Sequence, residues 1–247
     1  MKKQYRTVII IAVWILLWQL AAMVINKRII FVGPAEVAAA LAGQAVKVEF
    51  WITVCRSAMR ICGGFLAAFV LGVLMGILAD RCGLLREFLE PAVGLLQSVP
   101  VASFVILALI WIGSENLSVL ISLIVVFPVI YRNTLQGMKS ADEKMLEMAR
   151  VFRIGPMRTF LYIYRPALMP YLISASRIAF GMAWKSGVAA EVIGVPDRSI
   201  GEKLYMAKIY LSTAELFAWT LVIIVISRVL EHLFLLVLGM FDVRRGR

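Results

Sequence analysis

The sequence predicts an all-α, polytopic membrane protein with about six transmembrane helices in a single domain, residues 1–247. Hydrophobic residues make up 62% of the chain and the mean hydropathy is +0.90, whereas soluble domains are close to half apolar. Apolar runs long enough to cross a bilayer recur along the chain, and short charged or Gly/Pro-containing segments separate most of them. A soluble globular domain does not explain this pattern.

The first apolar run, residues 8–25, follows three basic residues and is interrupted only by Gln19. Its 18 residues are enough to span a bilayer core and exceed the apolar region of a signal peptide. We therefore expect a retained first helix, with cleavage as the alternative. Further spans are expected at about 57–79, 92–112, 117–131, 168–190 and 214–240. In the longer connection over 26–56, the stretch "FVGPAEVAAALAG" predicts a short interfacial helix.

A stripe of small residues occupies one face of the second expected span. Its members, one every four positions, are Gly64, Ala68, Gly72 and Gly76. Small side chains let two helices approach closely, which favours association where lipid offers no hydrophobic drive. The stripe fits packing inside the bundle or a subunit interface, and the sequence leaves both open.

The distribution of lysine and arginine predicts that both termini are cytoplasmic. With that orientation, the inside segments hold 15 of the 26 basic residues and the outside segments hold 8. The remaining three, Arg177, Lys185 and Arg228, lie within expected spans. The inverted orientation would put the larger number outside, against the positive-inside rule.

The same distribution argues against nucleic-acid binding, because the net charge of +11 arises largely from basic residues between apolar spans. The three cysteines lack metal-ligand spacing, so we expect no metal site. The phosphate-binding pattern GxxxxGK[ST] is absent from the sequence. The chain therefore has no visible means of binding ATP.

The segment 140–166 combines a short amphipathic helix with many charges. Ser140 and Glu143 fit a capping box, which predicts a helix start. An apolar stripe at helical spacing follows, formed by Met145, Met148, Ala149 and Phe152. Gly155-Pro156 is expected to end this helix. Its apolar face would lie on the bilayer or on the chain's own helices, or it would dock into the groove of a soluble partner.

The stretch "LEMARVFRIGPMRTFLYIYRPALMP", residues 146–170, resembles the EAA loop of ABC-importer permeases. That pattern is Glu-Ala-Ala, three residues, a glycine, then Leu-Pro and a second proline. The matching residues are Glu147, Ala149, Pro166 and Pro170. The departures are Met148 for the first alanine, Arg153 for the glycine with Gly155 two residues on, and Arg165 for the leucine. Because the glycine is displaced, Gly155-Pro156 is expected to supply the turn.

The resemblance extends along most of the chain to one branch of these permeases, which transports nitrate, sulfonates, taurine or bicarbonate. "SVPVASFVILALIWIG" (98–113) is similar to the third helix of that branch. "SRIAFGMAWKSGVAAEVIG" (176–194) is similar to a later helix, through Arg177, Gly181, Trp184 and Glu191. "VGPAEVAAAL" (32–41) resembles its first loop, and the three motifs occur in the expected order.

The resemblance implies an inner-membrane permease subunit of an ATP-driven importer for a small, anionic solute or a vitamin precursor. It implies two copies that form the path as a homodimer, two separate ATP-binding subunits and an extracytoplasmic solute-binding protein. The chain would be no enzyme and would bind no cofactor, because ATP and Mg belong to the partner ATPase. The expected ATPase-coupling residues are Glu147, Met148, Ala149, Phe152, Arg153 and Gly155. Among them, Glu147 and Ala149 are expected to make the contact itself.

Charged residues inside a membrane span are costly and indicate function by default. The expected translocation-path residues are Arg177, Trp184, Lys185 and Glu191. Arg177 and Lys185 would give an electropositive path for an anion, although Arg177 also fits a structural ion pair. Trp184 also fits ordinary packing. Glu191 also fits capping or a salt bridge to Arg198 at the outer end of its helix.

Two further polar segments follow in the C-terminal part of the chain. Arg228, Glu231 and His232 share one helix face, which predicts a buried structural pair rather than catalysis. The stretch "VPDRSIGEKLYMAKIY" (195–210) reads as an outer loop with a short helix that closes the outer mouth or meets the binding protein.

Two other function classes remain as alternatives. A self-sufficient secondary transporter or channel would use the intramembrane charges without a docking helix. An intramembrane enzyme would need a nucleophile–base pair or a metal cluster, and a single histidine with scattered acids supplies neither.

Overall fold

The computed structural model describes residues 2–27 and 29–241, in which all the regular elements are helices and no strand occurs. The all-α prediction is confirmed. In chain order the elements are α1 (Lys2–Ile25), α2 (Pro34–Ala45), α3 (Val48–Arg81), α4 (Gly83–Ser98), α5 (Val101–Ile112), α6 (Leu117–Lys139), α7 (Glu143–Val151), α8 (Pro156–Thr159), the π-helical turn η1 (Phe160–Tyr164), α9 (Arg165–Gly194), α10 (Ile200–Ile209) and α11 (Thr213–Met240).

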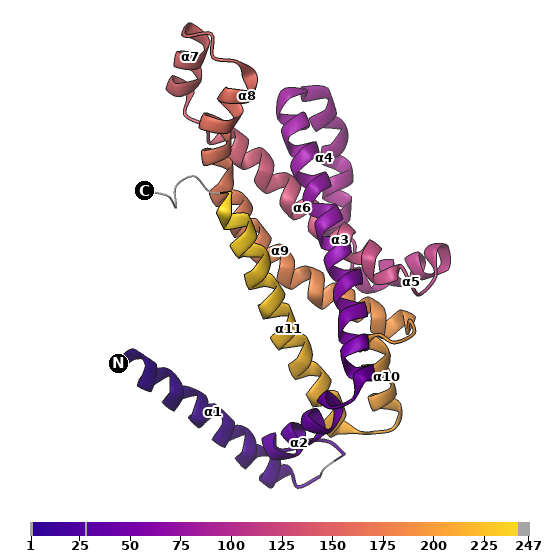
Figure 1. Cartoon of the computed structure of the whole chain (residues 1–247). Helices are drawn as coiled ribbons and strands as arrows, with labels where there is room; N and C mark the ends of the chain where they lie inside the picture. The colour runs from indigo at the N-terminus through magenta and orange to yellow at the C-terminus, as the bar shows by residue number, and fades with distance from the viewer. Residues whose placement is uncertain (1, 28, 242–247) are drawn as a thin grey trace.

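The centre of the fold is the packing of α6 against α3 on one side and α9 on the other, with α11 beside α9 (Figure 1). Aromatic rings join three of these helices: the Phe65 ring on α3 lies 4.8 Å from that of Phe180 on α9 and 4.9 Å from that of Phe234 on α11, between centroids. Burial of such large apolar side chains stabilises the bundle core. In contrast, α1 extends away from the bundle next to α2 (Figure 1).

The small-residue stripe of α3 packs against α6. A Cβ built on Gly64 would lie 2.3 Å from the carbonyl oxygen of Val119, and one built on Gly76 would lie 2.6 Å from the Cβ of Thr134. Such distances are shorter than real Cβ contacts, so only glycine allows the two helices to lie this close. The stripe therefore serves packing inside the chain, one of the two alternatives that the sequence allows.

Four helices are long and apolar enough to cross a membrane: α1, α3, α6 and α11. The pair α4 and α5 passes the same test together but is bent by 106°. The prediction of a single helix over 92–112 is therefore wrong. Pro100 stands at the break, where it lacks an N–H and holds the preceding residue in an extended conformation.

Helix α9, which carries Arg177, Lys185 and Glu191, is not among these candidates, although its 30 residues exceed the length that a bilayer needs. The number of six spans stays a prediction. The expected helices in the first loop and in the stretch 195–210 are confirmed as α2 and α10.

Candidate coupling surface and polar centre

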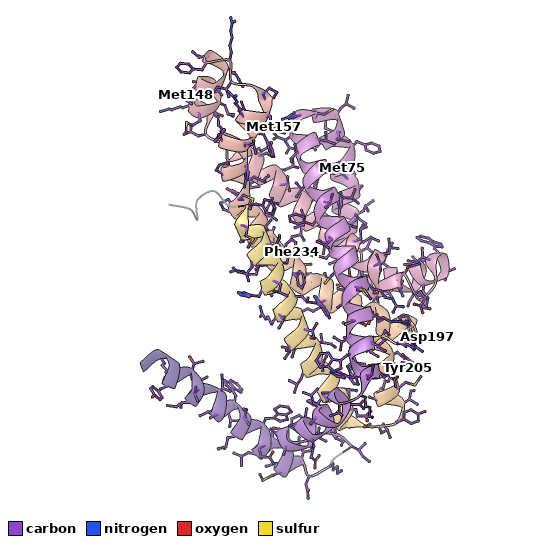
Figure 2. The ribbon with its side chains drawn as sticks, in the orientation of Figure 1. Met75, Met148, Met157, Asp197, Tyr205 and Phe234 are labelled. Carbon is purple, nitrogen blue, oxygen red and sulfur yellow. The ribbon has the colours of Figure 1, made fainter. Side chains whose placement is uncertain are left out.

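Helix α7 lies at one end of the molecule together with α8, beyond the ends of the long helices (Figure 1). Figure 2 shows Met148 of α7 and Met157 of α8 at this end, whereas Asp197 and Tyr205 lie toward the opposite end. The N-cap of α7 is Asp142, whose carboxylate accepts the N–H of Lys144 at 2.9 Å. The capping box predicted for Ser140 is wrong, because α6 continues to Lys139 and Ser140 is its C-cap.

The turn after α7 is formed by Arg153, whose φ of +49° lies in the left-handed region. The N–H of Ile154 donates to the carbonyl of Ala149 at 2.8 Å, and the N–H of Arg153 donates to that of Arg150 at 3.1 Å. These two bonds are the Schellman pattern that ends many helices, usually with glycine at the left-handed residue. Arg153, which stands where the EAA pattern has glycine, thus adopts a conformation that glycine usually supplies.

Gly155 has an ordinary φ of −60° and precedes Pro156, the first residue of α8. The prediction that Gly155-Pro156 supplies the turn is therefore wrong, because the turn lies two residues earlier in the chain.

The coupling residues predicted on α7 divide between an outer and an inner face. Glu147, Met148 and Phe152 are exposed, and Phe152 has 73% of its surface accessible. Ala149, in contrast, is buried within the chain at 3%. The small side chain of Ala149 faces the chain itself, and the exposed residues form the outer surface of α7, so a direct partner contact by Ala149 is not favoured and the coupling role of the others stays a prediction.

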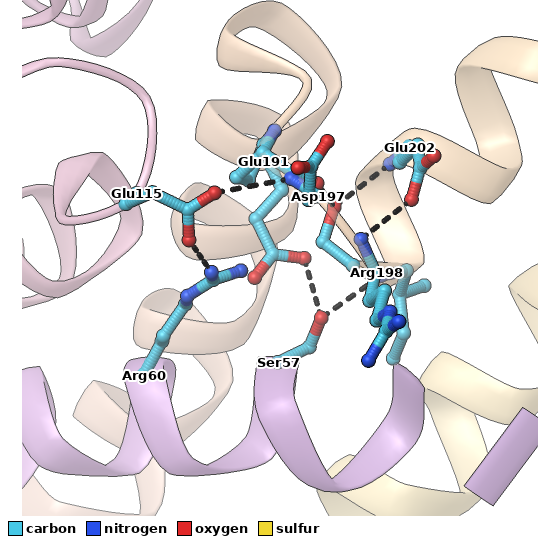
Figure 3. Close-up of polar contacts among 10 residues, drawn as sticks. Ser57, Arg60, Glu115, Glu191, Asp197, Arg198 and Glu202 are labelled. Atoms are coloured by element: carbon cyan, nitrogen blue, oxygen red, sulfur yellow. Dashed lines mark hydrogen bonds and ion pairs between the residues drawn. The ribbon is translucent and has the colours of Figure 1, made fainter. Parts of the chain in front are cut away.

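A buried polar centre joins α3, α9 and α10 at the other end of the bundle (Figure 3). The Ser57 hydroxyl donates to the Glu191 carboxylate at 2.7 Å and accepts the N–H of Ile200 at 2.9 Å. The N–H of Gly201 also donates to Glu191, at 3.3 Å. Ser57 and Glu191 have no exposed surface. Ser199 is the N-cap of α10, and the Glu191 carboxylate accepts a further N–H at the same terminus, where the helix dipole favours a carboxylate.

The close crossing of α9 and α10 requires glycine at position 201. A Cβ there would lie 2.3 Å from the backbone carbon of Glu191. Of the two roles expected for Glu191, capping is observed, and its carboxylate meets Ser57 and α10 rather than Arg198.

A partly buried ion pair lies next to this centre, with Arg60 16% exposed and Glu115 56% exposed. Arg60 on α3 pairs with Glu115, which precedes α6, and Glu115 accepts the N–H of Asp197 at 3.2 Å (Figure 3). The connection between α9 and α10 holds Val195 and Arg198 at φ values of +46° and +52°. Left-handed backbone costs about 1–3 kcal/mol for such residues and persists only where surrounding contacts enforce it. The hydrogen bonds from the N–H of Asp197 to Glu115 and from the N–H of Val195 to the carbonyl of Glu191 are such contacts.

The residues predicted for the translocation path do not share one surface. Arg177 and Lys185 are exposed on α9, whereas Trp184 lies in the core with 2% of its surface accessible and Glu191 lies in the polar centre. The packing role of Trp184 that the sequence allowed is the one observed. Of these four residues only Arg177 and Lys185 have exposed side chains, and a role of any of them in a translocation path stays a prediction.

On α11, Arg228 and Glu231 pair at 3.1 Å, but the prediction of a buried pair is wrong for Arg228. Its side chain is 75% exposed while that of Glu231 is 12% exposed. His232 is exposed as well. Within residues 2–27 and 29–241, no group of His, Cys, Asp or Glu side chains is arranged to hold a metal ion.

The chain is similar to membrane components of known transport systems. Residues 68–247 match the family model "Binding-protein-dependent transport system inner membrane component". A putative aliphatic sulfonates transport permease protein of Bacillus subtilis is 30% identical over 182 residues, which cover 73% of this chain and 64% of that protein. The taurine transport system permease protein of Escherichia coli is 25% identical, covering 90% and 82%.

A bicarbonate transport system permease protein of Synechocystis is 30% identical over 146 residues, 58% of this chain and 51% of that protein. The matched region thus spans between half and two thirds of the sulfonate and bicarbonate relatives. Among solved structures, the crystal structure of an amino acid ABC transporter with histidines aligns with a TM-score of 0.54 at 19% identity. The alignment covers 78% of this chain and 94% of that one, and it supports the fold.

Proposed function

The chain belongs to the family of binding-protein-dependent transport system inner membrane components, and we propose that it is the permease subunit of an ATP-driven importer for a small anionic solute. As a member of this family it is a multi-pass membrane protein and a transport permease, not an enzyme. The observation that carries the proposal is the position of α7, an exposed amphipathic helix held beyond the ends of the long helices (Figure 1).

The surface of α7 suits a separate ATPase subunit. Met148 and Phe152 offer apolar contact area, with 42% and 73% of their surfaces exposed, and Glu147 adds a charge beside them. An amphipathic helix of this kind binds in a groove of a partner. From Pro156 to Gly194 the chain is helical without a break, so a displacement of α7 and its turn acts on α9. Two ATPase subunits would thereby drive a pair of permeases.

The solute class follows from charges at membrane depth. Arg177 and Lys185 on α9 and Arg228 on α11 are exposed in this chain, and charged side chains at membrane depth are costly unless they face water or other protein. We infer that they face water or a second copy of the chain. A path between two copies would then be electropositive and would favour an anion. Relatives named for sulfonates, taurine and bicarbonate agree with this class.

The orientation completes the proposal. With α7 and both termini in the cytoplasm, the polar centre and α10 lie toward the opposite face, where an extracytoplasmic binding protein would deliver the solute. The excess of basic residues in the segment 132–167 supports this orientation.

The test is uptake by proteoliposomes that contain the permease, the ATPase and the binding protein. Glu147→Arg reverses a charge on the outer face of α7, and we expect loss of both ATPase co-purification and ATP-driven uptake. Glu87→Arg makes the same change at an exposed position of α4 and is expected to change neither. Full ATP-driven uptake by Glu147→Arg would refute the coupling assignment. Uptake by the permease alone, without ATPase, would instead identify a secondary transporter or channel.

A further inference from the structure

Arg165 is the first residue of α9 and stands where the EAA pattern has leucine. Its guanidinium contacts a residue 76 positions away: Nε donates to the carbonyl oxygen of Phe241 at 2.9 Å, and Nη2 donates to the same oxygen. Phe241 is the C-cap of α11. Carbonyl groups at the end of a helix lack intrahelical partners and form the negative pole of its dipole. A guanidinium satisfies both the hydrogen bond and the charge.

Helices α9 and α11 also pack through apolar side chains such as Phe180 and Phe234, and the Arg165 contact adds a hydrogen-bonded link at the end nearest α7 and α8. Arg165 directly follows η1 and therefore lies between the stretch from α7 to η1 (the coupling segment, residues 143–164) and the rest of α9. From Phe241, α11 runs back to α2 and α10 at the far end of the bundle, where it packs on both (Figure 1). Helix α11 thus has one end at the coupling segment and the other beside the polar centre.

We propose that Arg165 is a positioning residue that makes α11 follow the movement of the coupling segment. A displacement of α7 and α8 reaches α9 through the continuous helix and reaches α11 through the guanidinium. Helix α11 then carries the displacement to α2 and α10. Leucine at this position has no hydrogen-bond donor, and lysine supplies a point charge without the planar donor geometry of arginine. This inference rests on the proposed function, because the displacement comes from the ATPase.

The first experiment measures solute transported per ATP hydrolysed, using the complete transporter in proteoliposomes. Arg165→Leu should still bind the ATPase and hydrolyse ATP, with at least a threefold fall in solute per ATP. Arg165→Lys should give an intermediate ratio. Arg158→Leu removes an exposed arginine from α8 and serves as the matched control with an unchanged ratio. An unchanged ratio of solute to ATP in Arg165→Leu overturns the proposal. A proportional loss of ATP hydrolysis and uptake also overturns it, because such a loss indicates a merely structural role.

The second experiment follows the helices themselves by spin-label distance measurements, with the three native cysteines replaced by serine. One label pair joins Val70 on α3 to Leu236 on α11, and the other joins Val70 to Ile178 on α9; all three positions are exposed. On trapping the ATP-bound transporter, both distances should change in the otherwise native chain. In Arg165→Leu the α9 distance should still change, whereas the α11 distance should not. Equal changes of the α11 distance with and without Arg165 overturn the inference, and failure of the native chain to bind an ATPase overturns the proposed function instead.

Discussion

Two adjacent glycines on α3 should respond in opposite ways to the same substitution. Gly64 faces α6, and a Cβ there would lie 2.3 Å from the Val119 carbonyl oxygen and 2.9 Å from the Cβ of Ser122. Gly63, one residue earlier, has no atom within 4 Å of a built Cβ. Ordinary van der Waals contact begins at 3.4 Å, so Gly64→Ala must push α3 and α6 apart by about 1 Å.

The expected magnitude follows from two opposing effects. Overpacking of a close contact costs about 1–3 kcal/mol, while alanine in place of glycine in a helix interior gains about 0.5–1 kcal/mol. Gly64→Ala should therefore lower the free energy of unfolding by about 1–2 kcal/mol. Gly63→Ala has only the favourable term and should leave the protein unchanged or slightly more stable.

The measurement is unfolding of the purified permease in mixed micelles, titrated with a denaturing detergent and followed by circular dichroism. The two single variants share composition, helix and substitution, so their difference isolates the α3–α6 contact. Equal destabilisation by Gly63→Ala and Gly64→Ala would refute the conclusion that the stripe packs inside the chain. Such a result would favour a subunit interface along α3.

Three further substitutions test the two ends of the molecule. Arg153→Gly should raise the melting temperature and retain uptake, because glycine avoids the cost of about 1–2 kcal/mol that other residues have in the left-handed conformation. A lower melting temperature would contradict the Schellman turn. Gly201→Ala should reduce the yield of folded protein, whereas Gly181→Ala, at a position with open space around it, should not. Equal yields of the two variants would contradict the close packing of α10 against α9. Ser57→Ala removes a hydrogen-bond donor from the buried carboxylate of Glu191 and should lower the free energy of unfolding in detergent by about 1–3 kcal/mol. An unchanged unfolding titration would contradict this hydrogen bond.

Hydropathy predicted the helices well because long apolar runs have few alternatives to helix in a membrane. It failed at Pro100, where a run continuous in composition is broken in the structure by a residue without an N–H. It also failed at Ser140, since a capping pattern indicates a possible helix start but does not show where the preceding helix ends. In both cases the sequence pattern is present, but the local backbone places the end of a helix where the pattern alone does not show it.

The polar centre was beyond sequence reasoning for a different reason. Ser57 lies 134 residues from Glu191 and 143 from Ile200, and nothing in the sequence pairs positions so far apart. Two local signals were present: a carboxylate near the end of an apolar helix, and Gly201 at the start of the next helix. They indicate a capped, close crossing only once the fold has brought Ser57 of α3 beside them.

The two arginines that depart from the EAA pattern suggest which part of the coupling loop is constrained. Arg153 replaces glycine, yet its backbone keeps a left-handed turn with both Schellman bonds. Arg165 replaces leucine and bonds to the backbone carbonyl of Phe241. At Arg153 both bonds join main-chain groups, so the path of the chain there can be preserved while the side chain changes, whereas the contact of Arg165 depends on its guanidinium. The exposed side chains of α7 are then free to match a particular ATPase, because they do not determine the position of the helix that presents them.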